Sequence, residues 1–310
     1  MRREFVRALV DLGERDPRVV LLTGDLGYMA LEPFAERFPG RFFNVGVAEQ
    51  NMLGLATGLA ESGYVPFAYS IATFASMRPY EFLRDGPILH SLPVRLVGIG
   101  GGLDYGHNGV SHFALEDVSL MRTQPDLTVM IPAHPRHAAQ AVAATEGLDR
   151  PVYLRLERVE QDIPALDEPF RVGGASLVGD GDDVAIVAVG SCAEEALTAR
   201  ELLADQGVHA TVAIVTTFNP SPVDDLRSLV RRVPLVVTAE AHLPNGGLRS
   251  FVAETIAEAG CGCRLVSHTV DTLPRAMSGS REFLYEHYRL SAGQLVSSAL
   301  EALESRSARP

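Results

Sequence analysis

Short apolar runs alternate with helical patterns along the first half of the chain. Six runs have the length and composition of strands: Val19–Leu22, Arg41–Val45, Val65–Tyr69, Val94–Ile99, Leu127–Ile131 and Val152–Arg155. Helical patterns lie between them, among others at about Tyr80–His90 and Pro135–Gly147. This alternation predicts a parallel sheet that is covered by helices on both faces.

The pattern lapses after Val159 and then starts a second time. Acidic residues, prolines and glycines between 161 and 174 indicate a linker. Four further strand-like runs follow: Val184–Val189, Val212–Val215, Leu235–Thr238 and Arg264–Val266. The sequence therefore predicts two parallel-sheet, three-layer α/β domains, residues 1–160 and 175–310, joined by the linker 161–174.

One carboxylate occupies an unusual place in this pattern. Glu49 follows the second strand-like run and opens a helix, Met52–Ala60, that consists almost entirely of small and apolar residues. Such a helix is too apolar for the surface, so we expect Glu49 to enter the core, where a charged acid needs a partner. A purely structural charge at a helix N-terminus is the alternative.

Other residues of interest also follow predicted strands. Asp25 comes after the first strand, Phe74 after the third and the Gly100 segment after the fourth, while Arg155 closes the last strand of this half. Ligands of open α/β sheets bind beyond the carboxyl ends of the strands. We therefore expect a ligand site at this edge of the first sheet.

The composition narrows the class of protein. Of the 310 residues 46% are hydrophobic and 21% charged, which is typical of a soluble globular chain. The formal charge of −12 argues against nucleic-acid and anionic-membrane surfaces. No apolar run approaches the roughly 18 residues of a membrane span, and Met1–Arg7 lacks the apolar core of a signal peptide. Together with only three cysteines, these features predict a cytoplasmic protein.

The ordered motifs resemble the pyrimidine-binding and C-terminal domains of the transketolase family. The segments that carry the resemblance are Gly46–Met52, Ala72–Phe74, Gly106–His112 with Glu116–Asp117, Pro151–Arg155, Thr238–His242 with Gly246–Leu248, Ser278–Ser280 and Tyr285–Tyr288. They span nearly the whole chain. The resemblance implies a thiamine-diphosphate pyrimidine-binding fold followed by a transketolase C-terminal domain-like fold.

The resemblance also implies roles toward the cofactor thiamine diphosphate. Glu49 would bond a ring nitrogen of the aminopyrimidine and so promote the intramolecular proton loss that gives the thiazolium ylid. Phe74 would stack on the aminopyrimidine, and Asp25 would lie on the cofactor side of a subunit interface. The structural alternatives are a core phenylalanine for Phe74 and an Asx-type turn for Asp25.

Four further residues would face the substrate. By resemblance His112 would exchange a proton with a substrate oxygen, Asn108 would contact a hydroxyl, and Arg155 and Arg158 would bind an anionic group. A loop histidine and surface salt bridges are the alternatives. Other positions depart from the transketolase pattern, because Gly100 and Met29 stand where related enzymes place a histidine and a serine. These departures weaken the case for an ordinary phosphorylated ketose donor.

The diphosphate-binding motif of thiamine enzymes is missing. Gly179-Asp180-Gly181 precedes a strand, whereas the family motif follows one, so we interpret it as a turn. Cys261-Gly262-Cys263 lacks a second pair of ligands at metal spacing. The resemblance thus implies that Mg²⁺ and the diphosphate are held by a partner, an N-terminal transketolase-like subunit, in an α2β2 assembly.

Three functions stay open at this stage. The first is the catalytic β-type subunit of a two-component transketolase-like enzyme, a transferase that moves a two-carbon ketol unit between sugar-type substrates. The second is a thiamine-diphosphate-dependent 2-oxo acid decarboxylase, acyltransferase or dehydrogenase β subunit, which the short spacing in Phe74–Arg78 favours. The third is a non-catalytic subunit, against which Glu49 and Phe74 argue together.

Overall fold

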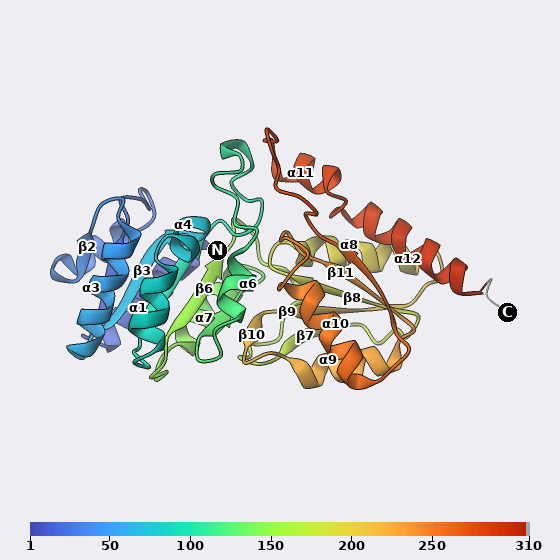
Figure 1. Cartoon of the computed structure of the whole chain (residues 1–310), viewed down its shortest axis with the longest axis horizontal. Helices are drawn as coiled ribbons and strands as arrows, with labels where there is room; N and C mark the ends of the chain where they lie inside the picture. The colour runs from blue at the N-terminus through green and yellow to red at the C-terminus, as the bar shows by residue number, and fades with distance from the viewer. Residues whose placement is uncertain (308–310) are drawn as a thin grey trace.

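Two β-sheets with helices on both faces form the framework of the computed structural model, which describes residues 1–307 (Figure 1). The first sheet has seven strands in the order β10-β5-β6-β4-β3-β1-β2, and the second has five in the order β12-β11-β8-β9-β7. The predicted fold class, two successive α/β units, is confirmed. No helix within residues 1–307 is both long and apolar enough to cross a membrane.

The elements of the first unit are α1 (Arg2–Arg15), β1 (Val19–Thr23), α2 (Glu32–Arg37), β2 (Phe42–Asn44), α3 (Glu49–Glu61), β3 (Val65–Ile71), α4 (Ala72–Met77), α5 (Tyr80–Leu83), β4 (Arg95–Ile99), α6 (Asp117–Arg122), β5 (Thr128–Met130), α7 (Pro135–Ala144) and β6 (Val152–Leu156). Those that follow are β7 (Ala175–Val178), β8 (Val184–Val189), α8 (Cys192–Ala204), β9 (Ala210–Val215), β10 (Thr217–Asn219), α9 (Val223–Arg232), β11 (Leu235–Ala239), α10 (Leu248–Ala259), β12 (Arg264–His268), α11 (Arg281–His287) and α12 (Ala292–Ser307).

Alternate residues of the central strands face opposite helical layers. In β1, Val19 and Leu21 belong to the core beneath α1 and α7, whereas Val20 and Leu22 belong to the core beneath α3. Successive side chains of a strand point to opposite sides, so a strand that is apolar throughout must be covered on both faces. The apolar composition of α3 has the same origin, because Met52, Leu53 and Ala56 are its buried contacts with the sheet.

Two edge strands correct the prediction of purely parallel sheets. β7 pairs antiparallel with β9, and β10 pairs antiparallel with β5 although β10 lies in the second half of the chain. Through β10 the second half adds a strand to the first sheet and carries Phe218 into a core that both units share. Both strands are short, and their pairing joins segments that are distant along the chain, so they were not among the predicted runs.

A buried charged cluster joins the two units at the end of β6. The guanidinium of Arg155 lies 3.1 Å from Glu157 Oε1, and its Nε lies 3.6 Å from Asp117 Oδ2. Tyr153 donates to the same Asp117 oxygen at 2.8 Å, and the second carboxylate oxygen of Glu157 accepts from the backbone N–H of Ser191 in the second unit. Burial alone lowers the pKa of Arg155, but the two carboxylates raise it above its ordinary value.

The loop after β4 can approach this cluster only because it is made of glycine. A Cβ on Gly101 would stand 1.9 Å from Arg155 Nε, and a Cβ on Gly190, at the other side, would stand 2.1 Å from Glu157 Oε1. The charges are thus enclosed by backbone from both units. Arg155 is 2% exposed and is part of the domain junction, not of a solvent-facing site.

Replacing Arg155 by methionine removes the cation and leaves two buried carboxylates unpaired. We expect Arg155→Met to lower the free energy of unfolding by about 3–5 kcal/mol, as for other broken buried ion pairs. Urea unfolding at pH 7 measures the change. The exposed Arg158 provides the matched control, because Arg158→Met should cost less than about 1 kcal/mol. Equal destabilisation by both variants would contradict the role given to the cluster.

Candidate active site

Glu49 is buried at the first position of α3. Its side chain is 1% exposed, and both carboxylate oxygens accept a hydrogen bond. Ser70, near the end of β3, donates to Oε1 at 2.9 Å, and Arg78 donates from Nη1 to Oε2 at 2.7 Å. The carboxylate therefore enters the core with a cation beside it. Sequence reasoning anticipated the need for a partner but did not identify Ser70 or Arg78.

Phe74 and Arg78 form one wall beside this carboxylate. Phe74 lies on α4, and Arg78 directly follows the last residue of that helix, one turn after Phe74. The guanidinium carbon of Arg78 is 4.0 Å from the centroid of the Phe74 ring, a cation–π contact. The imidazole of His112 meets the same ring edge-on at a centroid distance of 5.2 Å. The structure thus brings Glu49, Phe74 and His112 into one neighbourhood.

The loop between β4 and α6 carries His112 together with Ser111 and Tyr105, which contact its imidazole. Ser111 Oγ lies 3.0 Å from His112 Nδ1, and the Tyr105 ring is 5.9 Å from the imidazole. The exposed Arg158 stands over Tyr105 at 5.5 Å. Asn108 is exposed in a short 3-10 turn of this loop. The predicted substrate residues Asn108 and His112 therefore lie on one loop, and Arg158 contacts Tyr105 of the same loop.

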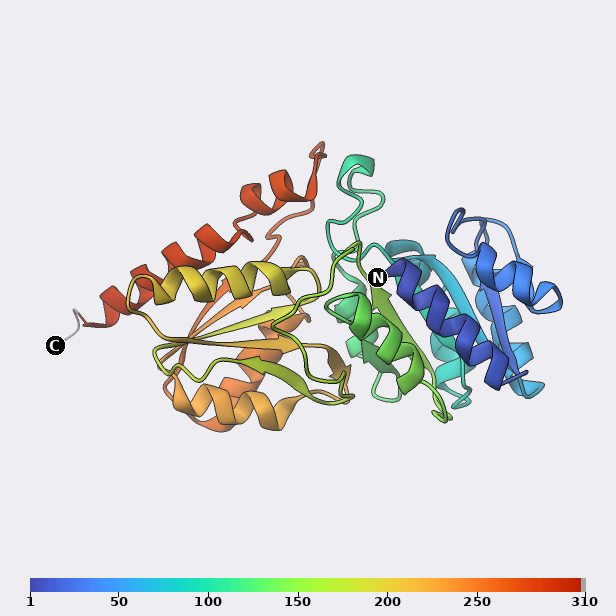
Figure 2. The ribbon, with the colours of Figure 1, turned by 180° about the vertical axis from the view of Figure 1, so that it is seen from behind.

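The second unit holds this loop in place. Gly279 donates its backbone N–H to Gly106 O at 3.1 Å, and Leu243 donates to Leu115 O at 2.9 Å. A Cβ on Gly106 would stand 2.2 Å from Gly279 O, so the two segments touch through backbone. Figures 1 and 2 show the loop rising beside the segment that precedes α11. The small residues of that segment thus serve to support the loop with His112.

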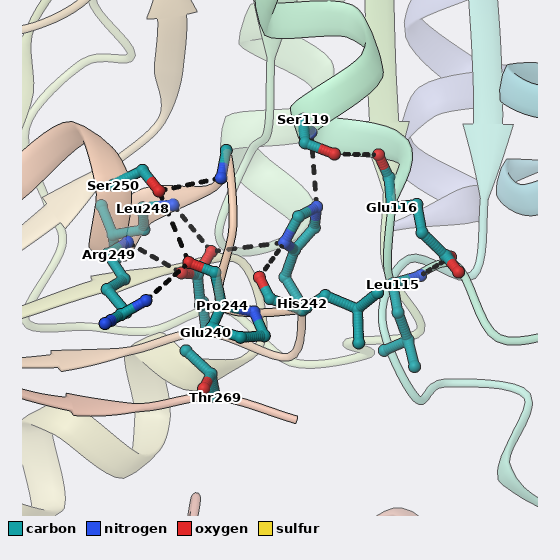
Figure 3. A network of polar contacts seen from close by, with 12 residues as sticks. Leu115, Glu116, Ser119, Glu240, His242, Pro244, Leu248, Arg249, Ser250 and Thr269 are labelled. Atoms are coloured by element: carbon teal, nitrogen blue, oxygen red, sulfur yellow. Dashed lines mark hydrogen bonds and ion pairs between the residues drawn. The ribbon is translucent and has the colours of Figure 1, made fainter. Parts of the chain in front are cut away.

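His242 of the second unit is part of the junction between the units (Figure 3). His242 Nε2 accepts from the backbone N–H of Ser119 at 3.3 Å, and its Nδ1 lies 2.6 Å from Leu243 O, so Nδ1 carries the proton. Glu240 accepts from the N–H groups of Leu248 and Arg249 at the start of α10. Burial raises the pKa of Glu240. His242 thus joins the two units, and Glu240 caps the start of α10.

Asp25 stands at the turn after β1. Asn44 Nδ2 and the Tyr28 hydroxyl donate to Asp25 Oδ1 at 2.9 and 3.0 Å, and these hydrogen bonds lower the pKa of the carboxyl. The preceding Gly24 lies against Glu49, because a Cβ there would stand 3.5 Å from Glu49 Oε1. Asp25 thus follows a residue that lies against the buried carboxylate, and its own side chain is exposed.

Metal-binding groups do not gather in the part of the chain that the structure describes. Among residues 1–307 no group of three or more His, Cys, Asp or Glu side chains could hold a metal ion. Gly179–Gly181 connects β7 with β8 and so precedes a strand, in agreement with the sequence pattern.

Comparison with known proteins decides the family. The pyrimidine-binding domain of transketolase matches residues 1–162, and the C-terminal domain of transketolase matches residues 173–295. The chain belongs to the transketolase family. It is 33% identical to the putative transketolase C-terminal section of Methanocaldococcus jannaschii, over 98% of this chain and 96% of that protein.

Two further relatives have the same extent. The 6-deoxy-6-sulfo-D-fructose transketolase subunit SqwH of Clostridium sp. is 35% identical over 100% of this chain and 96% of its own length. A solved split-gene transketolase, described as an inactive β4 tetramer, is 34% identical with a TM-score of 0.87 and 98% of each chain covered. The resemblance to C-terminal subunits of split transketolases is therefore confirmed for this family member.

The carboxylate of Asp104 connects the loop that carries His112 with the segment after β6 and gives the stability of the fold a pH dependence. Asp104 accepts from the backbone N–H of Arg158, and burial together with the nearby Glu157 raises its pKa to about 7. The folded state therefore retains a proton that the unfolded state has lost. Stability from this group is complete at low pH and is lost as the pH rises toward 7.

We expect Asp104→Asn to remove this dependence. The variant should gain stability over the wild type as the pH rises from 4.5 to 7.5, because the amide stays neutral. Thermal unfolding midpoints at several pH values measure the difference, with the exposed Asp126→Asn as control. A difference between Asp104→Asn and wild type that does not change with pH would contradict the assignment.

Proposed function

We propose that this chain is the catalytic β-type subunit of a two-component, thiamine-diphosphate-dependent transketolase-like enzyme. It transfers a two-carbon ketol unit between sugar-type substrates. The observation that carries the proposal is the buried carboxylate of Glu49 beside the flat ring of Phe74, at the edge of the sheet where the family binds its cofactor. A non-catalytic scaffold would have no use for a charge in that position.

The residues present fit one half of the cofactor. Glu49 would hold a proton at the ring nitrogen of the aminopyrimidine, Phe74 would cover one face of the ring, and Gly24 leaves room beside the carboxylate. When bound, thiamine diphosphate supplies a nucleophilic carbon that accepts and releases the ketol unit. Ser70 would keep the carboxylate in one orientation, because its hydroxyl already bonds Oε1. Asp25 would face the partner side of the cofactor.

The substrate would lie against the loop that carries His112. His112 would exchange a proton with the reacting oxygen, and Asn108 would donate to a hydroxyl. Arg158 would pair with an anionic group at the far end of the substrate, and the relative named for a sulfo sugar supports an acid-bearing substrate. Arg155 is not included, because its guanidinium is enclosed by Asp117 and Glu157.

A partner subunit would supply the diphosphate and Mg²⁺ site. Exposed apolar side chains on the segments that carry Asp25 and Glu49 support a protein partner: Tyr28 is 70% exposed, Met29 94% and Val47 69%. A solved relative described as an inactive β4 tetramer also supports the need for a second subunit. We propose an N-terminal transketolase-like subunit, an α2β2 assembly and a cytoplasmic location. We also propose the domain limits 1–160 and 175–310, with β10 added to the first sheet.

Exchange of the buried carboxylate tests the catalytic role. In the reconstituted pair, Glu49→Gln should lower kcat by about 100-fold or more, because the amide cannot hold a proton for the ring nitrogen. Ketose consumption measures kcat, and Glu61→Gln, at the exposed far end of α3, is the matched control. Full activity of Glu49→Gln would refute the role. Carbon dioxide release from a 2-oxo acid, with no ketose consumed, would favour the decarboxylase alternative.

Cofactor binding tests the need for a partner. Isothermal titration of thiamine diphosphate with Mg²⁺ should give no measurable heat of binding with the isolated chain. A saturable isotherm should appear once the diphosphate-binding subunit is added. Tight Mg²⁺-dependent binding by this chain alone would rule out the shared pocket.

A further inference from the structure

Arg78 makes both of the contacts that the proposed function assigns to the aminopyrimidine. Its guanidinium donates to Glu49 Oε2 at 2.7 Å and lies 4.0 Å from the centroid of Phe74. A guanidinium is planar and carries N–H donors at its edge, so it can stack on an aromatic ring and bond a carboxylate at the same time. A protonated aminopyrimidine ring presents the same combination of a flat face and an N–H edge.

The contact with Arg78 also occupies the carboxylate oxygen that a ring nitrogen would need. Glu49 is 1% exposed, and its Oε1 already accepts from Ser70. While Oε2 accepts from the Arg78 guanidinium, this oxygen cannot bond a second group in the same place. The contact therefore opposes the task that the proposed function gives to Glu49.

Arg78 can leave this position, whereas Glu49 cannot. The Arg78 side chain is 38% exposed and follows the last residue of the short helix α4. Glu49 opens α3, whose Met52 and Leu53 are fixed in the core. Ser70 continues to hold Oε1 when Arg78 moves away, so the carboxylate keeps its orientation.

We propose that Arg78 is a positioning residue that stands in for the aminopyrimidine in the cofactor-free subunit and is displaced when the cofactor binds. Before binding, it neutralises the buried Glu49 and covers Phe74. On binding, its guanidinium turns toward solvent and releases Oε2 for the ring nitrogen. This inference rests on the proposed function and adds to it that cofactor affinity is limited by the displacement of an internal cation.

Methionine at position 78 removes the competing charge and keeps an unbranched side chain. In the reconstituted pair, Arg78→Met should lower the Kd of thiamine diphosphate about tenfold at fixed Mg²⁺, measured by isothermal titration. In the isolated chain the same variant should lower the melting temperature, since Glu49 loses its cation. Arg84→Met is the matched control, because Arg84 is 63% exposed and forms an ion pair with its neighbour Asp85. It should change neither quantity.

If Arg78→Met binds thiamine diphosphate more tightly although the variant itself is less stable, Arg78 competes with the cofactor. A merely structural role of Arg78 would instead predict weaker binding by this variant.

Should Arg78→Met prove too unstable, the double variant Glu49→Gln with Arg78→Met removes both charges and should melt close to the wild type. Arg78→Lys, which keeps the charge and loses the planar stack, should bind the cofactor with a Kd between those of wild type and Arg78→Met.

The outcomes distinguish this inference from the proposed function. A wild-type pair that binds the cofactor, together with an unchanged or raised Kd for Arg78→Met, overturns the displacement and leaves the proposed function in place. A wild-type pair that binds no thiamine diphosphate overturns both. A lower Kd for Arg78→Met with an unchanged Kd for Arg84→Met supports the displacement.

Discussion

Burying charge is costly unless each charge meets a partner, and this constraint shapes both the domain junction and the candidate site. At the junction, Arg155 satisfies Asp117 and Glu157, and Glu157 in turn accepts from the backbone of the second unit. The enclosed cluster fixes the end of β6 against the second unit. The loop that carries His112 then has a rigid surface on both sides.

The same constraint acts on Glu49. Here the cation is Arg78, whose side chain is partly exposed and can be exchanged for another group. The buried acids Glu157 and Glu49 therefore differ in whether the cation beside them can reach solvent. The partner of Glu157 is enclosed by glycine backbone, while the partner of Glu49 can reach solvent. A permanent ion pair gives stability, and an exchangeable one prepares a binding site.

The candidate site is built from sequence segments that are far apart. The first sheet provides Glu49 and Phe74 at the carboxyl edge of its strands, and the second unit supports the loop with His112 through Gly279 and Leu243. The second unit thus contributes to the candidate site by supporting this loop through backbone contacts.

The sequence by itself determined the α/β class, the central strands and the unusual position of Glu49, because these follow from local periodicity and from a charge beside an apolar helix. The family motifs also located Phe74 and His112. Tertiary structure alone decided that Arg155 belongs to the junction, that β10 joins the first sheet and that Arg78 pairs with Glu49. These facts depend on contacts between segments distant along the chain, and a linear pattern of residues does not specify which charge meets which.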